Sequence, residues 1–243
     1  MDVEGLLASC KANDDVLGAF LFGSRGRGVG VDDRSDWDVW IVARDDYALQ
    51  RIEERFPYEH GATVEVASST LDGLRTHGAI GSRSEWARYQ HAHVDVRVDK
   101  THGELGRVLA EKELIPPEHR NAVVREALGG FCNATFRSLR YGNRLDAAES
   151  IPHALRAIFA LAGRVRPFNK YLYWELCHHA IDGWPAETLL PLVAGVLDQD
   201  PASQHELFVL VERDARSHGF GDEIDGWEPD VAWLRGEAEY RPG

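Results

Sequence analysis

The stretch FLFGSRGRGVGVDDRSDWDVWIV, Phe20–Val42, joins a strand-like segment to a glycine-serine turn and then to two aspartates that lead into a second apolar run. Asp36 and Asp38 directly precede and enter the run VWIV, which predicts a strand entering a core. Because residues i and i+2 of a strand point to the same face about 6.7 Å apart, both carboxylates face one point. At about 4 Å apart they would repel by roughly 4 kcal/mol at an effective dielectric of about 20.

A divalent cation would offset this repulsion. Magnesium favours a few carboxylates together with water and substrate phosphates, and a pair of strand aspartates supplies the protein's share of such a shell. The alternative is an exposed pair at the start of a strand, but the turn of Gly23 and Ser24 precedes the pair at a workable distance. We therefore predict a magnesium site at Asp36 and Asp38.

A third carboxylate from another strand is expected for a two-metal site. The segment HVDVRV places Asp95 between valines, and an acid on an otherwise apolar strand needs a reason to be there. Asp95 is therefore predicted as the third ligand and proton acceptor. His91 and His93 would share its face, but this spacing is typical of solvated strand surfaces, and we expect no metal on them.

The glycines of GSRGRGVG do not form a common phosphate-binding motif. A P-loop needs a lysine and a hydroxyl residue after its second glycine, but Val29 and Gly30 follow Gly28. The dinucleotide pattern GxGxxG fails at Val31. What remains is a strand followed by a turn, whose freed backbone N–H groups can hold phosphate oxygens together with the Ser24 hydroxyl.

The first half of the chain alternates strand-like and helix-like segments. The expected strands are Leu17–Phe22, Asp38–Ala43, Ala62–Ser68 and His91–Asp99, and the clearest helix is Asp45–Phe56. From Pro116 onward apolar residues recur every three or four positions. We predict an α/β (α+β) domain over residues 1–114, with a mixed sheet flanked by helices, and an all-α helical-bundle domain over residues 115–243.

Composition narrows the classes of protein. The chain has 243 residues and 44% hydrophobic content, and no apolar run approaches the length of about 20 residues that spans a bilayer. Its start lacks the features of a signal peptide, so we expect a cytoplasmic protein with no membrane partner. A net charge of −13 disfavours long nucleic acids and suits a cationic small molecule. Three scattered cysteines are expected to be reduced, buried thiols.

The glycine-serine turn and the acids that follow it resemble the nucleotidyltransferase superfamily related to DNA polymerase β. The resemblance rests on Gly23 and Ser24 after a strand, the SDWDV unit with Asp36 and Asp38, and the later lone acid Asp95. Arg25 and the following RG are similar to the bacterial branch that includes aminoglycoside nucleotidyltransferases and the minimal nucleotidyltransferases paired with helical toxins. No acceptor-binding motif of the family is recognisable.

The segment His153–Leu176 is similar to the helical domain of the antibiotic nucleotidyltransferases. That likeness implies that this domain forms the other wall of the nucleotide cleft and that Lys170, near a helix start, contacts the nucleotide phosphates. Gly23, Ser24 and Arg25 would contact the phosphates from the first domain. A surface lysine is nearly as good an explanation of Lys170.

The resemblance implies transfer of a nucleoside monophosphate, AMP from ATP, to a hydroxyl of a small molecule, with two magnesium ions and release of pyrophosphate. An aminoglycoside-type antibiotic is the first expected acceptor, and a monomer or homodimer is expected. An antitoxin-like enzyme that modifies a protein partner is the alternative. A non-catalytic nucleotide sensor is disfavoured because all three acids are present.

Overall fold

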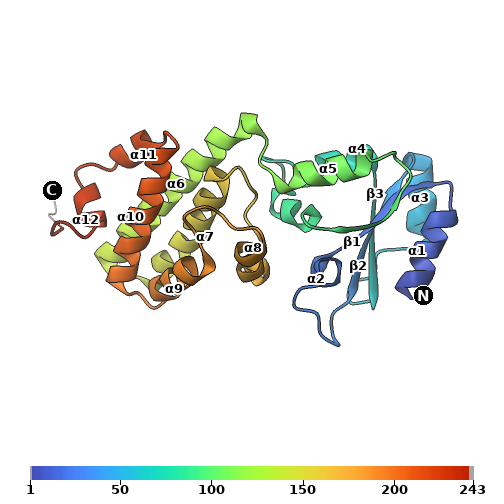
Figure 1. Ribbon diagram of the computed structural model, residues 1–243, viewed down its shortest axis with the longest axis horizontal. Coiled ribbons are helices and arrows are strands. Elements are labelled where there is room, and N and C mark those ends of the chain that lie inside the picture. The colour runs from blue at the N-terminus through green and yellow to red at the C-terminus, as the bar shows by residue number, and fades with distance from the viewer. Residues whose placement is uncertain (1, 241–243) are drawn as a thin grey trace. The chain divides into compact units, whose positions relative to one another are not determined.

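A computed structural model describes residues 2–240 and divides the chain into two compact units, Met1–Leu114 and Ile115–Gly243. The first unit is a four-stranded mixed sheet with helices on both faces, and the second is built of helices (Figure 1). The predicted fold class is therefore confirmed. None of the helices within residues 2–240 is long and apolar enough to cross a membrane.

The sheet of the first unit has the order β3-β2-β1-β4. Its strands are β1 (Val16–Phe22), β2 (Trp37–Ala43), β3 (Val64–Thr70) and β4 (Asp95–Asp99). β1 runs antiparallel to both β2 and β4, whereas β2 and β3 are parallel. The amino ends of β2 and β3 therefore lie at the same edge of the sheet, and a side chain entering β2 is brought beside one entering β3.

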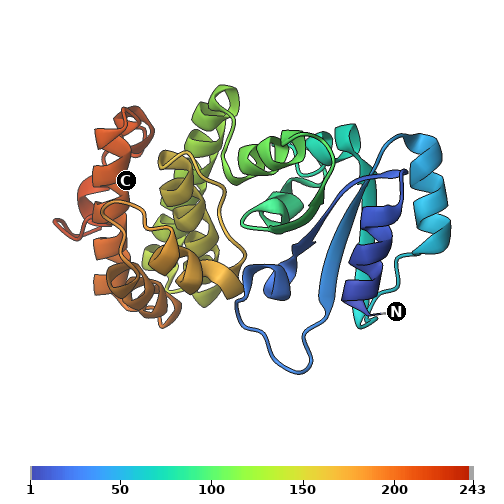
Figure 2. The ribbon, with the colours of Figure 1, turned by 45° about the vertical axis from the view of Figure 1, so that its right-hand side comes forward.

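Two helices cover one face of the sheet, and a second group covers the other (Figure 2). The first face packs on α1 (Val3–Ala12) and α3 (Asp46–Arg55), through a core that includes Leu6, Leu21 and Ile41. The other face packs on α4 (Leu71–Thr76) and α5 (Glu104–Glu113). Burial of apolar side chains on both faces fixes the register of the central strands, because a slip by one residue would exchange the faces.

A pair of histidines lies within the second face. His91, at the end of the 3-10 helix η1 (Glu85–His91), is 0% exposed, and its Nε2 lies 2.9 Å from Nδ1 of His77. Both rings contact the Trp40 ring, with centroids 4.9 and 5.1 Å away. Burial lowers the pKa of His91 to about 3, with a further contribution from His77. His91 is thus a neutral core residue.

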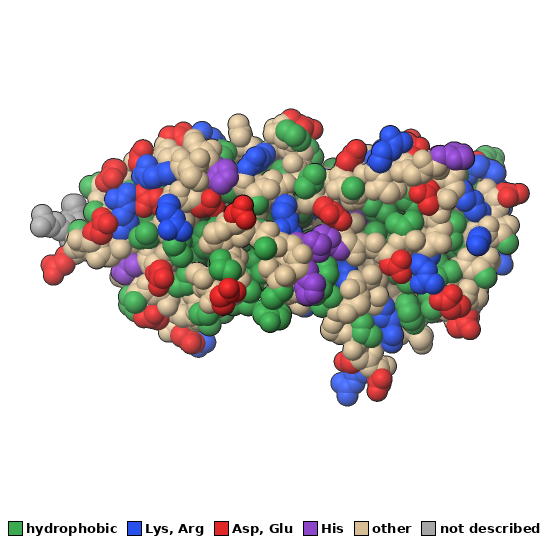
Figure 3. Space-filling view, in the orientation of Figure 1, with side chains coloured by type: hydrophobic (Ala, Val, Ile, Leu, Met, Phe, Trp, Pro, Cys, Tyr) green, Lys and Arg blue, Asp and Glu red, His purple; other side chains and the backbone are tan. Residues whose placement is uncertain are grey.

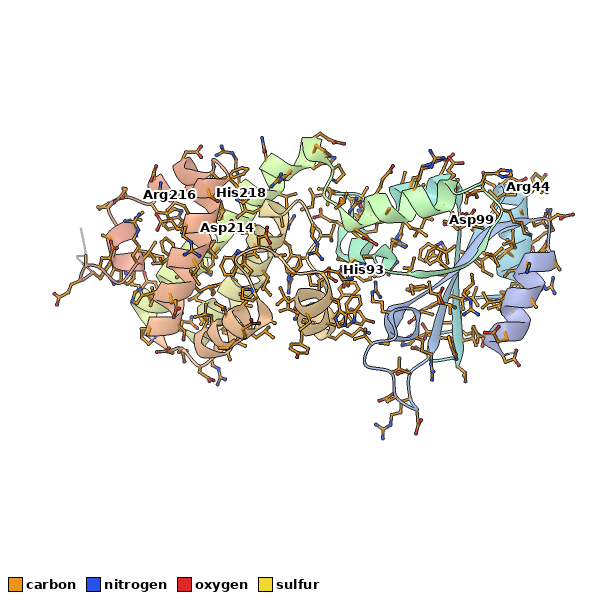
Figure 4. All side chains as sticks on the ribbon, viewed as in Figure 1. Arg44, His93, Asp99, Asp214, Arg216 and His218 are labelled. Carbon is orange, nitrogen blue, oxygen red and sulfur yellow. The ribbon has the colours of Figure 1, made fainter. Side chains whose placement is uncertain are left out.

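The expected strand at His91–Asp99 begins later than the pattern indicated. His93 has a φ of 52°, which extended backbone does not allow, and β4 starts only at Asp95. Figure 4 places His93 at the start of this segment and Asp99 at its other end. The expectation that His91 and His93 share a solvated strand face was wrong, because alternation in the sequence cannot distinguish a strand from a 3-10 turn followed by a kink.

The second unit is organised around two long helices, α6 and α7, which contact each other along their length. Its helices are α6 (Pro117–Tyr141), α7 (Arg144–Leu161), η2 (Asn169–Tyr171), α8 (Leu172–His178), α9 (Ala186–Leu197), α10 (Pro201–Ser217), α11 (Gly221–Asp225) and α12 (Val231–Leu234). α6 begins at the second proline of the IPP segment, where the missing N–H is tolerated.

The three cysteines are free, but they are not all buried. Burial raises the pKa of Cys10 to about 11 and that of Cys132 to about 12, so both are unreactive core thiols. Cys177 lies exposed on α8, which corrects the expectation of three buried thiols. Cys177 lies between the buried Leu176 and the exposed His178, so the local sequence does not decide whether it is buried.

Candidate functional site

The turn after β1 is built around Gly23. This residue begins the short helix α2 (Gly23–Arg27) with a φ of +65°, a conformation that glycine adopts without strain. A Cβ at this position would lie 1.7 Å from Oδ2 of Asp38. The absence of a side chain at Gly23 therefore lets the turn approach the Asp38 carboxylate directly.

Three carboxylates meet at the amino ends of β2 and β3. Asp36 immediately precedes β2, Asp38 is its second residue, and Glu65 is the second residue of β3. In the parallel register Asp38 pairs with Glu65, so their side chains emerge on the same face. One ligand oxygen from each of the three residues lies within 4.8 Å of the others. Repulsion at this distance is about 3 kcal/mol per pair at an effective dielectric of about 20.

The loop before β3 holds Glu65 in place. The Gly61 N–H donates to its Oε1 over 2.5 Å, and Nδ1 of His60 lies 3.3 Å from the same oxygen. The Tyr58 hydroxyl donates to Oε2 over 3.3 Å. The negative charge of Glu65 is the largest cause that raises the pKa of Tyr58, and Asp38 and Asp36 contribute to the same shift. The charges of all three acids therefore act on the Tyr58 hydroxyl.

This donor set fits a hard divalent cation. Three carboxylates and no sulfur or neutral imidazole in the cluster favour magnesium over zinc or copper. Asp36, Asp38 and Glu65 are the residues that would hold it, and substrate phosphates and water would complete its shell.

The structure separates Asp95 from this cluster. Asp95 is the first residue of the edge strand β4 and pairs with Leu21 of β1, whereas Asp38 pairs with Phe22. Successive residues of a strand point to opposite faces, so Asp95 and Asp38 lie on opposite faces of the sheet. Asp95 is exposed and forms an ion pair with Arg97, which also contacts Glu4 of α1. The third acid of the cluster is Glu65 in place of the predicted Asp95.

Glu65 was the residue that sequence reasoning missed. It lies in VEV, an acid between two valines, which is the same signal that selected Asp95. Two strands therefore carried equivalent signals. Only the strand order, with β3 next to β2 and β4 beyond β1, decides which acid reaches Asp38.

Arg25 braces the segment that carries Asp36. Its Nε donates to the carbonyl of Ser35 over 2.9 Å, and its guanidinium stacks over the Trp37 ring 4.8 Å from the centroid. A longer contact of 3.5 Å reaches the carbonyl of Asp32. These interactions engage the residues on both sides of Asp36, and a contact of Arg25 with the nucleotide phosphates stays a prediction.

Two further residues, Ser24 and Lys170, were predicted to contact the nucleotide. Ser24 follows Gly23 in α2 and is half-buried. Lys170 belongs to the second unit, where it is exposed on η2 and its Nζ lies over the adjacent Tyr171 ring at 4.8 Å. A role for either residue at the nucleotide phosphates stays a prediction.

Comparison with known proteins gives similarity to solved structures only. No family model matches the chain, and no curated protein matches it. Among solved structures, the chain is similar to a nucleotidyltransferase-like protein from Exiguobacterium sibiricum 255-15, with 11% sequence identity and a TM-score of 0.34. The match covers 96% of this chain and 90% of that one.

Proposed function

We propose that this chain is a magnesium-dependent nucleotidyltransferase that transfers AMP from ATP to a hydroxyl of a small molecule and releases pyrophosphate. The observation that carries the proposal is the cluster of Asp36, Asp38 and Glu65 beside the glycine turn at Gly23. Nucleotidyl transfer needs positioning and charge stabilisation more than covalent catalysis, so a carboxylate cluster beside a glycine-serine turn suits it.

Each residue has a defined task in this proposal. Asp38 would hold the cation from β2 and Asp36 from the position just before it, and Glu65 would hold it from β3. Bound magnesium would supply charge neutralisation for the nucleotide phosphates. Gly23, Ser24 and Arg25 would contact the phosphates at the turn, and Arg25 also keeps Asp36 in position through Ser35 and Trp37.

The acceptor that we propose is a cationic antibiotic of the aminoglycoside type. The support is the net charge of −13 and the resemblance of the sequence motifs to the antibiotic branch of the superfamily. On the face shown in Figure 3, acidic and basic side chains are interspersed, so attraction of a cation would come from the overall charge rather than from one acidic patch there.

The test is mass spectrometry of reactions that contain the purified full chain, magnesium, one nucleoside triphosphate at a time and a panel of aminoglycosides and lincosamides. We expect an adenylyl adduct on one compound, with pyrophosphate released in equal amount. Absence of any nucleotidyl adduct and of pyrophosphate release would reject the proposal. Modification of an added protein, with no small-molecule adduct, would favour the protein-modifying alternative.

Matched variants connect this reaction to the cluster. Asp36→Asn, Asp38→Asn and Glu65→Gln should each lower turnover at least about 100-fold, because removal of one charge from the cation's shell costs several kcal/mol of stabilisation. Asp33→Asn is the control, since it removes one exposed acid from the same loop outside the cluster. Full turnover in Asp36→Asn or Asp38→Asn would remove the cluster from the mechanism.

A further inference from the structure

Tyr58 places a hydroxyl group at the carboxylate cluster. It lies in the loop between α3 and β3, and its side chain is 62% exposed although its hydroxyl donates to Glu65 Oε2. The same loop returns to Glu65 at Gly61, whose N–H binds the other carboxylate oxygen. The loop therefore forms two hydrogen bonds with the Glu65 carboxylate, and these keep the Tyr58 phenol beside the cluster.

The position of this hydroxyl has a chemical consequence. A general base must lie within hydrogen-bond reach of the proton that it removes. Glu65 stands in that relation to Tyr58, because its Oε2 lies 3.3 Å from the Tyr58 hydroxyl. The Tyr58 oxygen thus occupies a place that an acceptor hydroxyl would take at this cluster.

We propose that Tyr58 is itself a nucleotidyl acceptor and that the chain modifies its own Tyr58. This inference rests on the proposed function. The Tyr58 oxygen attacks the α-phosphorus of a nucleoside triphosphate, a bond from oxygen to phosphorus forms, and the bond from the α-phosphorus to the bridging oxygen breaks. The phenol proton passes to Glu65, and pyrophosphate leaves with the electron pair of the broken bond.

Other exposed tyrosines supply internal controls. Tyr47 on α3 is 79% exposed, more than Tyr58, but it lies outside the carboxylate cluster. Tyr173 on α8 is 67% exposed and forms a hydrogen bond with Cys177. If exposure alone determined modification, these residues would be labelled at least as readily as Tyr58.

The test incubates the full chain with magnesium and each nucleoside triphosphate in turn, without an added acceptor, and maps the modified peptide by mass spectrometry. We expect a nucleoside monophosphate on Tyr58. Tyr58→Phe should lose the label, whereas Tyr47→Phe should keep it and should bind Mn²⁺ with the affinity of the unsubstituted chain. Since Tyr58 reaches its own Glu65, the fraction labelled per unit time should not change across a dilution series of the protein.

The outcomes separate this inference from the proposed function. Label on Tyr47 or Tyr173 equal to that on Tyr58, or a labelling rate that rises with protein concentration, would overturn self-modification at Tyr58. A small-molecule adduct formed without any label on Tyr58 would overturn it while the transferase function stands. No pyrophosphate, no adduct and no label would overturn both.

Discussion

A Cβ added at Gly23 would fall 1.7 Å from the Asp38 carboxylate, whereas one added at Gly30 would meet nothing within 4 Å. Both glycines have a positive φ, +65° and +64°. Replacement by alanine therefore costs about 1 kcal/mol of backbone strain at either position, and only at Gly23 does it also displace a cluster carboxylate.

We expect Gly23→Ala to weaken Mn²⁺ binding at least about tenfold, since displaced ligand geometry has costs of that order. Gly30→Ala should leave Mn²⁺ affinity unchanged while losing similar stability. Calorimetric titration with Mn²⁺ and urea unfolding measure the two quantities. Equal Mn²⁺ affinities in the two variants would show that the contact with Asp38 does not matter.

The thiols differ in reactivity because they differ in burial. In the native protein we expect a disulfide reagent such as dithionitrobenzoate to modify Cys177 rapidly, and Cys10 and Cys132 only after unfolding. Thiol titration with and without denaturant, followed by peptide mapping, measures this. Cys177→Ser should abolish the rapid reaction, and a rapid reaction that persists in that variant would contradict the assignment.

At the level of elements, the strand order decides which acid completes the cluster. β3 adjoins β2 directly, whereas β4 is separated from β2 by β1. Glu65 therefore lies beside Asp38, whereas the register of β4 and β2 on β1 places Asp95 on the opposite face of the sheet.

Glu65→Gln should weaken Mn²⁺ binding at least about tenfold and reduce turnover, while Asp95→Asn should change neither. Asp95→Asn removes an exposed ion pair with Arg97, and such pairs contribute at most about 1 kcal/mol to stability. The comparison is made by Mn²⁺ titration and by pyrophosphate release. A large loss of Mn²⁺ affinity in Asp95→Asn would restore Asp95 as the third ligand.

For the molecule as a whole, the buried histidine pair contributes to the pH dependence of stability. The pKa of His91 is lowered to about 3 from its usual 6.5, so between these values the unfolded chain binds a proton that the folded chain does not. The free energy of unfolding therefore falls as the pH falls through this window. Paired carboxylates such as Asp15 and Glu212, whose pKa values are also lowered, act in the same direction.

The variant His91→Gln measures how much His91 contributes to the pH dependence of the free energy of unfolding. In His91→Gln, the slope of unfolding free energy against pH between about pH 4 and about pH 6 should decrease by up to about 1.4 kcal/mol per pH unit. His119→Gln, at an exposed histidine of α6, should keep the original slope. Urea unfolding at a series of pH values measures both. An unchanged slope in His91→Gln would mean that His91 is protonated in the folded protein.

The sequence by itself determined the local features. Alternating and helical periodicities predicted a sheet flanked by helices and the helical second half, because these periods report which side of an element is buried. The GS turn and the SDWD spacing predicted the position of Asp36 and Asp38, since neighbouring residues on one strand have fixed relative directions.

Tertiary structure alone decided the relations between distant segments. Asp95 and Glu65 give the same local signal, and only the parallel pairing of β2 with β3 selects Glu65. In the same way, only the structure shows that Arg25, which was predicted as a phosphate ligand, contacts Ser35 and Trp37 on either side of Asp36. The physical reason is that strand order and side-chain partnering depend on contacts between residues far apart in the chain, which spacing within one segment does not encode.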